Sequence, residues 1–159
     1  MVSVSRAFVR ESDGDETLEV LPDRQISSHP NWVTAEGQAL IEAEIERLQA
    51  AQTKAQASDD KQAVASIGRD LRYWLARRSS AEVKPAPEQH ETVAFGSKVT
   101  IERDDARRVT YRIVGEDEAD PTKGTLSFVS PLARALMGKA VGDVVSVGKG
   151  EVEIVAISV

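Results

Sequence analysis

Two helical seams separated by a short break are the feature that most restricts how this chain can fold. From 34 to 57, seam residues recur at spacings of four and three, and the same alternation returns from 61 to 75. The seam residues are Ile41, Ile45, Leu48, Gln52 and Ala55, then Val64, Ile67, Leu71 and Trp74. This spacing is typical of a two-stranded coiled coil rather than of a broad globular face. Because the break at 57–60 is too short for a crossover, the sequence predicts an antiparallel helical hairpin over residues 32–83.

The far end of the predicted hairpin carries two adjacent carboxylates, Asp59 and Asp60. Two interpretations of these residues stay open. Ser58 or Asp59 is a suitable N-cap for the second helix, just as Thr34 is for the first, and the acids then only end the turn. Alternatively, the carboxylates take part in chemistry, because oxygen ligands suit Mg²⁺ and a metal-bound water is a better nucleophile than bulk water.

A proline-containing stretch separates the hairpin from the rest of the chain. Two prolines within residues 84–92 stiffen the backbone and remove donors, so no helix can continue there and a linker is predicted. Beyond it, residues 93–159 alternate apolar and polar side chains, as around Val99 and Ile101, with the period of half-buried strands. We therefore predict an α+β chain, in which a helical hairpin precedes a small, mostly antiparallel sheet with one short helix.

The short helix begins at Ser130. Its hydroxyl can cap free backbone N–H groups, and Pro131 occupies the first helical position, where no N–H is needed. The helix carries Arg134 and lies next in sequence to an acidic loop at 116–120. A cationic helix beside a loop of carboxylates indicates an interaction surface.

Composition excludes several classes of protein. The chain has no cysteine, which rules out disulfides and thiolate metal sites, and its two histidines lack ligand spacing. No apolar run approaches the roughly 18 residues that a membrane helix needs. The net charge of −6 argues against nucleic-acid binding over the whole surface. Arginines expected on the exposed face of the second helix, among them Arg69, Arg72, Arg77 and Arg78, can still meet an acidic partner or RNA. We expect a monomeric cytoplasmic protein without membrane contact.

Residues 1–31 are predicted to form a flexible leader. The segment is acidic around 11–16 and has few bulky apolar side chains, so burial cannot offset the entropy of ordering it. Phe8 and Leu18 are among the exceptions. They leave open the alternative that the leader is anchored to another part of the protein.

The C-terminal half resembles a known family. Tyr-Arg-Ile-Val-Gly-Glu-Asp-Glu-Ala-Asp at 111–120 and Ser-Pro-Leu-Ala-Arg-Ala-Leu-Met-Gly-Lys at 130–139 are similar to the C-terminal domain of the bacterial GreA/GreB transcript cleavage factors. Phe95-Gly96 and the Gly-Glu-Val-Glu at 150–153 fit the same pattern. The resemblance implies an FKBP-like fold that docks on RNA polymerase near the mouth of its secondary channel. The residues that it assigns to docking are Asp117, Glu118, Asp120, Ser130, Pro131, Leu132, Ala133 and Arg134.

The hairpin resembles the same family less completely. Trp-Val-Thr-Ala-Glu-Gly at 32–37 is similar to the start of the family's coiled coil, and 68–71 with 81–83 is similar to its return. The family's acidic tip motif, Gly-Asp-Leu-x-Glu-Asn-Ala-Glu-Tyr, is absent. The chain between Thr34 and Phe95 is also shorter than in the family by roughly eighteen residues, which at 1.5 Å per residue in each of two helices removes roughly 13 Å of reach.

Two functions follow from the resemblance. Neither makes the chain an enzyme, because no nucleophile–base pair, phosphate loop or metal cluster is visible in the sequence. In the first, Asp59 and Asp60 enter the secondary channel, close to the nascent RNA, share Mg²⁺ with the polymerase and promote cleavage of backtracked RNA. In the second, a Rnk-like regulator with a shortened coiled coil occupies the channel and competes with other factors without cleavage. A third alternative is an interaction module with an unrelated partner.

Overall fold

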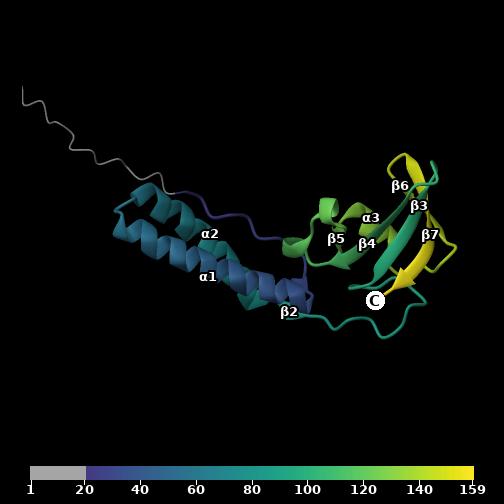
Figure 1. Ribbon diagram of the computed structural model, residues 1–159, viewed down its shortest axis with the longest axis horizontal. Helices are drawn as coiled ribbons and strands as arrows, with labels where there is room; N and C mark the ends of the chain where they lie inside the picture. The colour runs from purple at the N-terminus through teal and green to yellow at the C-terminus, as the bar shows by residue number, and fades with distance from the viewer. Residues whose placement is uncertain (1–20) are drawn as a thin grey trace, which may run out of the picture.

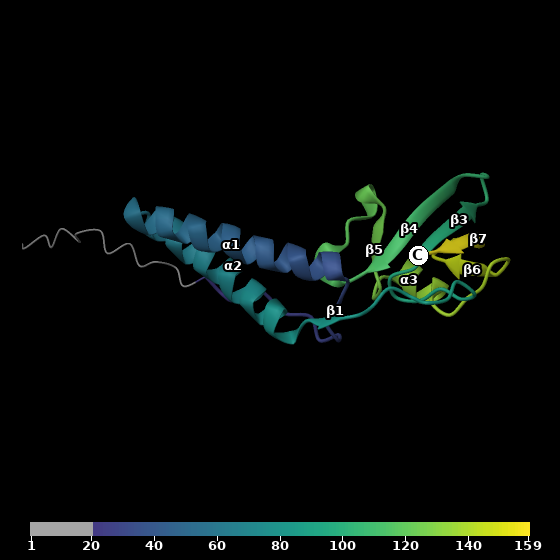
Figure 2. The same ribbon diagram turned by 60° about the horizontal axis from the view of Figure 1, so that its bottom comes forward.

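The structure, a computed structural model, describes residues 21–159, so most of the predicted leader lies outside the described residues. Two helices form a rod at one end of the molecule, and a curled sheet forms a compact unit at the other (Figure 1). The view turned by 60° shows the same separation (Figure 2), so the rod projects away from the sheet instead of lying flat on it. Within residues 21–159, no helix is both long and apolar enough to cross a membrane.

The rod is the antiparallel hairpin that the sequence predicts. Helix α1 spans Ala35–Ala57 and helix α2 spans Lys61–Ser80. Thr34 caps α1 as predicted, because its hydroxyl oxygen accepts a hydrogen bond from the Gly37 amide at 3.0 Å.

The cap of α2 is Asp60, the second of the two acids at the turn. Asp60, and neither Ser58 nor Asp59, accepts a hydrogen bond from the Ala63 amide, at 3.1 Å. The reason is the way in which α1 ends. Asp59 adopts a left-handed backbone with φ 52°, and the Asp60 amide donates back to the Ala55 carbonyl at 3.0 Å. The chain turns through Asp59, and the next residue is then placed to begin α2.

The seam residues nearest the sheet form the apolar core of the hairpin. Ile41 and Ile45 are each 1 % exposed and pack together with the buried Val33. Partly buried residues of α2 and of the segment after it complete the cluster: Leu71, Trp74, Leu75 and Ala81. Towards the far end the seam continues with the buried Leu48 and then the smaller Ala55.

Five strands of the described chain form the sheet, in the order β5-β4-β3-β7-β6. Their bounds are β3 (Lys98–Arg103), β4 (Arg108–Val114), β5 (Thr125–Ser127), β6 (Val144–Val147) and β7 (Gly150–Ser158). The antiparallel β3–β4 hairpin and the turn at 104–107 are as predicted. Helix α3 (Pro131–Leu136) packs against the sheet, and its Ala133 and Leu136 join the core. The α+β class is therefore confirmed.

Two pairings differ from an antiparallel arrangement. Strand β5 runs parallel to β4, because two short 3₁₀ turns, η1 (Glu116–Glu118) and η2 (Pro121–Lys123), carry the chain back before β5 begins. The sheet is thus mixed. At the base of the rod, β1 (Trp32–Val33) and β2 (Glu82–Val83) form a parallel pair of two residues each. Such short strands have no periodicity that a sequence could reveal.

Replacing Ile45 by alanine tests the packing of the seam. We expect Ile45→Ala to lower the free energy of unfolding by about 2–5 kcal/mol, because it removes buried methyl groups and leaves a cavity. Leu40→Ala, on the outer face of α1 at 44 % exposure, is the matched control and is expected to change it by less than about 0.5 kcal/mol. Urea unfolding followed by the circular dichroism of the helices measures both. Equal losses would contradict the burial of this seam.

Candidate functional site

The tip of the rod carries the two predicted carboxylates. Figure 1 shows the loop between α1 and α2 at the end of the rod that is away from the sheet. Asp59 and Asp60 are both exposed there. The Asp60 side chain is the cap of α2, whereas no hydrogen bond within the described residues engages the Asp59 side chain. One carboxylate thus has a structural task, and the other is available to a partner.

The tip does not form a metal site by itself. Within the part of the chain that the structure describes, no group of three or more acidic, histidine or cysteine side chains is placed to hold a metal ion. Mg²⁺ in proteins is commonly held by one or two carboxylates together with waters and substrate phosphates. Asp59 and Asp60 therefore fit Mg²⁺ only as additional ligands in a site that another molecule completes.

Helix α3 presents part of the predicted docking surface. Pro131 and Arg134 are exposed, and Leu132 is partly exposed. Ser130 acts as the N-cap, accepting a hydrogen bond from the Ala133 amide at 3.3 Å. The Ala133 side chain is fully buried in the core of the sheet, so it cannot contact a partner.

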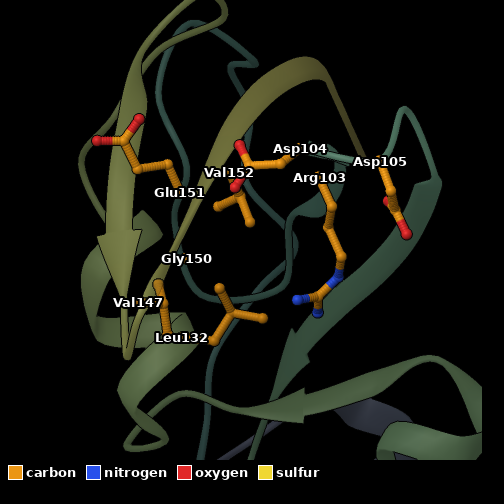
Figure 3. A pocket seen from close by; sticks show the side chains of 8 residues that line it. All are labelled: Arg103, Asp104, Asp105, Leu132, Val147, Gly150, Glu151 and Val152. Carbon is orange, nitrogen blue, oxygen red and sulfur yellow. The ribbon is translucent and has the colours of Figure 1, made fainter.

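A hollow of about 360 Å³ opens beside α3. Figure 3 shows it between the end of the β3–β4 hairpin and the β6–β7 hairpin, with Leu132 and Arg103 lining the same opening. The other lining residues are Asp104, Asp105, Val147, Gly150, Glu151 and Val152. The hollow has an apolar floor and a mostly acidic rim, and it borders α3 through Leu132.

The acidic loop, in contrast, is mostly turned inward. Asp117 accepts hydrogen bonds from the Tyr73 hydroxyl and, at 2.6 Å, from the Arg77 Nε. Glu118 accepts from the amide of Thr34 at 3.0 Å and from its hydroxyl. Two of the carboxylates that the resemblance assigns to docking thus bind the base of the hairpin.

Asp120, at the end of the loop, is partly exposed. It accepts a hydrogen bond from the Thr122 amide at 3.0 Å and so caps the turn η2. Hydrogen bonding from Thr122 holds the pKa of Asp120 below its usual value, and Lys123 acts in the same direction. Asp120 is therefore a persistent negative charge at the surface.

Arg77 lies at the centre of these contacts. It is 1 % exposed, although the sequence predicted it on the exposed face of the second helix. Its Nη2 donates to the Asn31 side-chain oxygen at 2.7 Å, and the Asn31 amide group donates to the Arg77 carbonyl at 2.8 Å. We name this set of residues the junction cluster: Asn31, Thr34, Tyr73, Arg77, Asp117 and Glu118. The arginine is buried because the acidic loop folds over the end of α2, a contact between residues about forty positions apart.

The junction cluster perturbs the tyrosine within it. Burial, together with the neighbouring Asp117 carboxylate that accepts a hydrogen bond from the hydroxyl, raises the pKa of Tyr73 to about 12. The phenol consequently stays protonated as a donor over the ordinary range of pH. Arg24 lies over its ring, with the guanidinium carbon 3.9 Å from the ring centre.

Sequence reasoning missed the junction cluster, although two glycines carried a signal. A Cβ at Gly37 would collide with the Glu118 carboxylate, and one at Gly115 would collide with the Trp32 carbonyl oxygen. Glycine is a poor choice in the first turn of a helix unless another group approaches closely. Gly37 therefore indicated that something packs against the start of α1.

The arginines of α2 are paired with carboxylates of the same chain. Arg69 lies 3.2 Å from Asp70, and Arg78 lies 3.4 Å from Glu42. Arg72 lies 2.8 Å from Asp23, in the leader segment that runs beside α2 in Figure 1. Their side chains stay 31–56 % exposed in these pairs, so contact of these arginines with an acidic partner or RNA stays a prediction. The domain boundaries, including those of the leader, stay a prediction.

The known sequences that are similar to this chain match its C-terminal half, which holds the sheet domain. The family described as "Transcription elongation factor, GreA/GreB, C-term" matches residues 88–159. The transcription elongation factor GreA of Alkalilimnicola ehrlichii is 50% identical over 70 residues, which are 41% of this chain and 44% of that protein. GreA of Helicobacter pylori is 41% identical over 80 residues, which are 47% of this chain and 49% of that protein.

Similar solved structures have lower sequence identity. The GreA factor homolog 1 (Gfh1) of Thermus thermophilus is 26% identical and covers 82% of this chain and 99% of its own, with a TM-score of 0.40. The elongation factor GreA/GreB of Nitrosomonas europaea is 22% identical and covers 81% and 99%, with a TM-score of 0.41.

The relationship thus rests on the sheet domain. The chain spans about half the length of the curated relatives that it matches. Within that half, the matched region holds the acidic loop, α3 and all five strands of the sheet. Residues 88–159 are therefore a domain of the family described as the GreA/GreB C-terminal domain.

Proposed function

We propose that this chain is an accessory factor that binds RNA polymerase through its sheet domain and inserts its helical rod into the secondary channel. The observation that carries the proposal is the rod itself, which projects from the family domain and exposes two carboxylates at its far end (Figures 1 and 2). A rod with a charged tip serves to reach into a narrow opening. A domain that merely bound a partner surface would have no use for it.

The exposed part of the α3 region supports docking. Pro131 and Arg134 face solvent, Asp120 adds a negative charge nearby in sequence, and the hollow beside Leu132 offers an apolar recess. Asp117, Glu118 and Ala133, which the resemblance includes in this surface, are engaged or buried within the protein. The docking proposal therefore rests on Asp120, Pro131, Leu132 and Arg134, with Ser130 holding the helix start in place.

At the tip, the proposed activity is assistance to RNA cleavage by the polymerase. Asp59 and Asp60 would add oxygen ligands to a Mg²⁺ ion of the polymerase; such an ion would polarise the water for hydrolysis of the RNA phosphodiester bond, in which the 3′ oxygen leaves. The part of this chain is to bring one or two oxygen ligands on a stiff support. Asp59 is the better placed, because its carboxylate is exposed and is not the cap of α2.

A second candidate function is competition for the channel without cleavage. Asp60 is committed to capping α2, and α1 has only 23 residues, which corresponds to roughly 35 Å at 1.5 Å per residue. Lys54 and Lys61 also lie close in sequence to the two acids and reduce the negative charge of the tip. These features favour a rod that fills the channel but supplies few metal ligands.

Removing the charge of the tip separates the two functions. In Asp59→Asn with Asp60→Asn, both negative charges are lost, while asparagine preserves the cap of α2. We expect the wild-type protein to shorten RNA in purified backtracked complexes and the double variant to be slower by about tenfold or more, as for the loss of metal-supporting groups. Glu42→Gln with Glu46→Gln, on the exposed shaft of α1, removes the same charge and should cleave normally. Unchanged cleavage by the tip variant would exclude this mechanism, and competition without any cleavage would favour the second function.

Reversing one charge on α3 tests the docking surface. Arg134→Glu is expected to raise the Kd for RNA polymerase by about tenfold, the effect of truncating an interface residue worth more than about 1 kcal/mol. Lys98→Glu, exposed at the opposite end of β3 from Arg103, makes a cation-to-anion change outside the hollow and should leave the Kd nearly unchanged. Fluorescence anisotropy of the labelled protein measures both. Equal effects of the two changes would indicate a general charge effect instead of docking by α3.

A further inference from the structure

We infer that Asp117 and Glu118 are positioning residues, which fix the direction of the hairpin on the sheet domain instead of contacting a partner. The effect on the polymerase rests on the proposed function, whereas the mechanical role stands on the junction cluster alone.

The two carboxylates hold different helices. Glu118 accepts hydrogen bonds from the Thr34 amide and hydroxyl, at the start of α1. Asp117 accepts from Tyr73 and Arg77, in the last two turns of α2. A single contact would leave a rod free to rotate about it. Two contacts from one short loop to two helices resist that rotation.

Burial makes the α2 contact directional. The Arg77 side chain is 2 % exposed and that of Asp117 is 6 % exposed, and their nitrogen and oxygen lie 2.6 Å apart. A buried charge that loses its partner is strongly destabilising. For Asp117 to reach a partner protein, it would have to leave Arg77 behind in the interior. Its geometry therefore suits a fixed internal support and does not suit an external docking group.

The α1 contact is made possible by glycine. Glu118 also accepts from the Gly115 amide at 3.3 Å, and its carboxylate occupies the space where a side chain at Gly37 would lie. A weaker ion pair between Arg112 of β4 and Glu36 of α1, at 3.6 Å, adds a third tie between the sheet and the same helix end.

An apolar contact joins the same two parts but does not set their angle. Trp32 stacks on Phe128, with ring centres 4.9 Å apart, and meets Phe95 edge to face at 5.9 Å. Apolar burial is largely non-directional, so these rings keep the domains together over a range of orientations. The hydrogen bonds of Asp117 and Glu118 select one orientation from that range.

The length of the rod amplifies any loss of direction. Over a rod of roughly 35 Å, a rotation of about ten degrees at the base moves the tip by roughly 6 Å. A displacement of even about 1 Å from a productive geometry is costly for assisted chemistry. The junction cluster thus determines where Asp59 lies relative to the sheet domain.

Spin labels measure the direction of the rod without a partner. The chain has no cysteine, so Gln56→Cys near the tip and Glu153→Cys on β7 provide two unique labelling sites, both exposed. We expect pulsed electron paramagnetic resonance to give one narrow distance distribution for the otherwise wild-type protein. With Asp117→Asn and Glu118→Gln, the distribution should broaden or shift. A broad wild-type distribution, or identical distributions in both proteins, would overturn the inference.

A glycine pair supplies a second, milder test. Gly37→Ala displaces the Glu118 carboxylate and should also broaden the distribution. Gly68→Ala, in the middle of α2, meets no atom closer than 3.7 Å and should leave it unchanged. Helical circular dichroism identifies any variant that fails to fold, and Gly37→Ala then decides the outcome.

Binding to RNA polymerase distinguishes positioning from docking. For the protein with both Asp117→Asn and Glu118→Gln, we expect a Kd within about twofold of wild type, as for residues outside an interface. When the factor saturates the polymerase, we expect a lower rate of RNA cleavage than with the wild-type protein. A Kd raised by about tenfold with an unchanged distance distribution would show that the carboxylates dock instead. If the wild-type protein does not bind polymerase, the proposed function fails, and the distance distributions still decide the mechanical role.

Discussion

The ion pair between Arg77 and Asp117 is the contact on which the arrangement of the whole molecule depends. A two-helix rod buries only a narrow seam, and its outer faces cannot pack on the sheet if the rod is to project. Its direction must therefore come from a small area at its base. The protein places its one almost fully buried arginine side chain there, among the residues that the structure describes, together with an acidic loop that reaches both helices. Burial makes the pair sensitive to geometry, which an apolar contact of the same size would not be.

Most of the local structure could be predicted from the sequence, because its causes are local. Thr34 and Ser130 are N-cap residues that indicate where helices begin, and the seam residues Ile41 and Ile45 repeat with the helical period. Val99 and Ile101 alternate as half-buried strand residues do, and the structure buries both completely. In each of these cases the sequence within a few positions determines the hydrogen bonds or the buried face.

What could not be predicted depends on contacts between distant residues. The parallel course of β5 results from how two 3₁₀ turns lead the chain back, which no alternation of side chains encodes. Arg77 has the same sequence context as the exposed Arg78, and only the approach of the loop some forty residues later buries it. For the same reason, the sequence indicates that Asp117 and Glu118 are exposed acids of a surface loop. Their partners, Tyr73 and Thr34, precede them in the chain by forty residues or more. Of the candidate site, the exposed tip acids and the start of α3 were foreseeable, and the internal use of the loop was not.

The ties at the base of the rod also give its length a meaning. The sheet domain carries the family relationship, and the rod lies outside the matched residues. If the base of the rod were loose, a shorter rod would only explore a smaller volume, and its length would say little about what the tip can reach. Because both helices are tied to one loop at their base, the direction of the rod is set within the protein, and its length becomes the variable that decides how far Asp59 lies from the sheet domain. A change in the length of the rod would then move the tip without any change to the sheet domain.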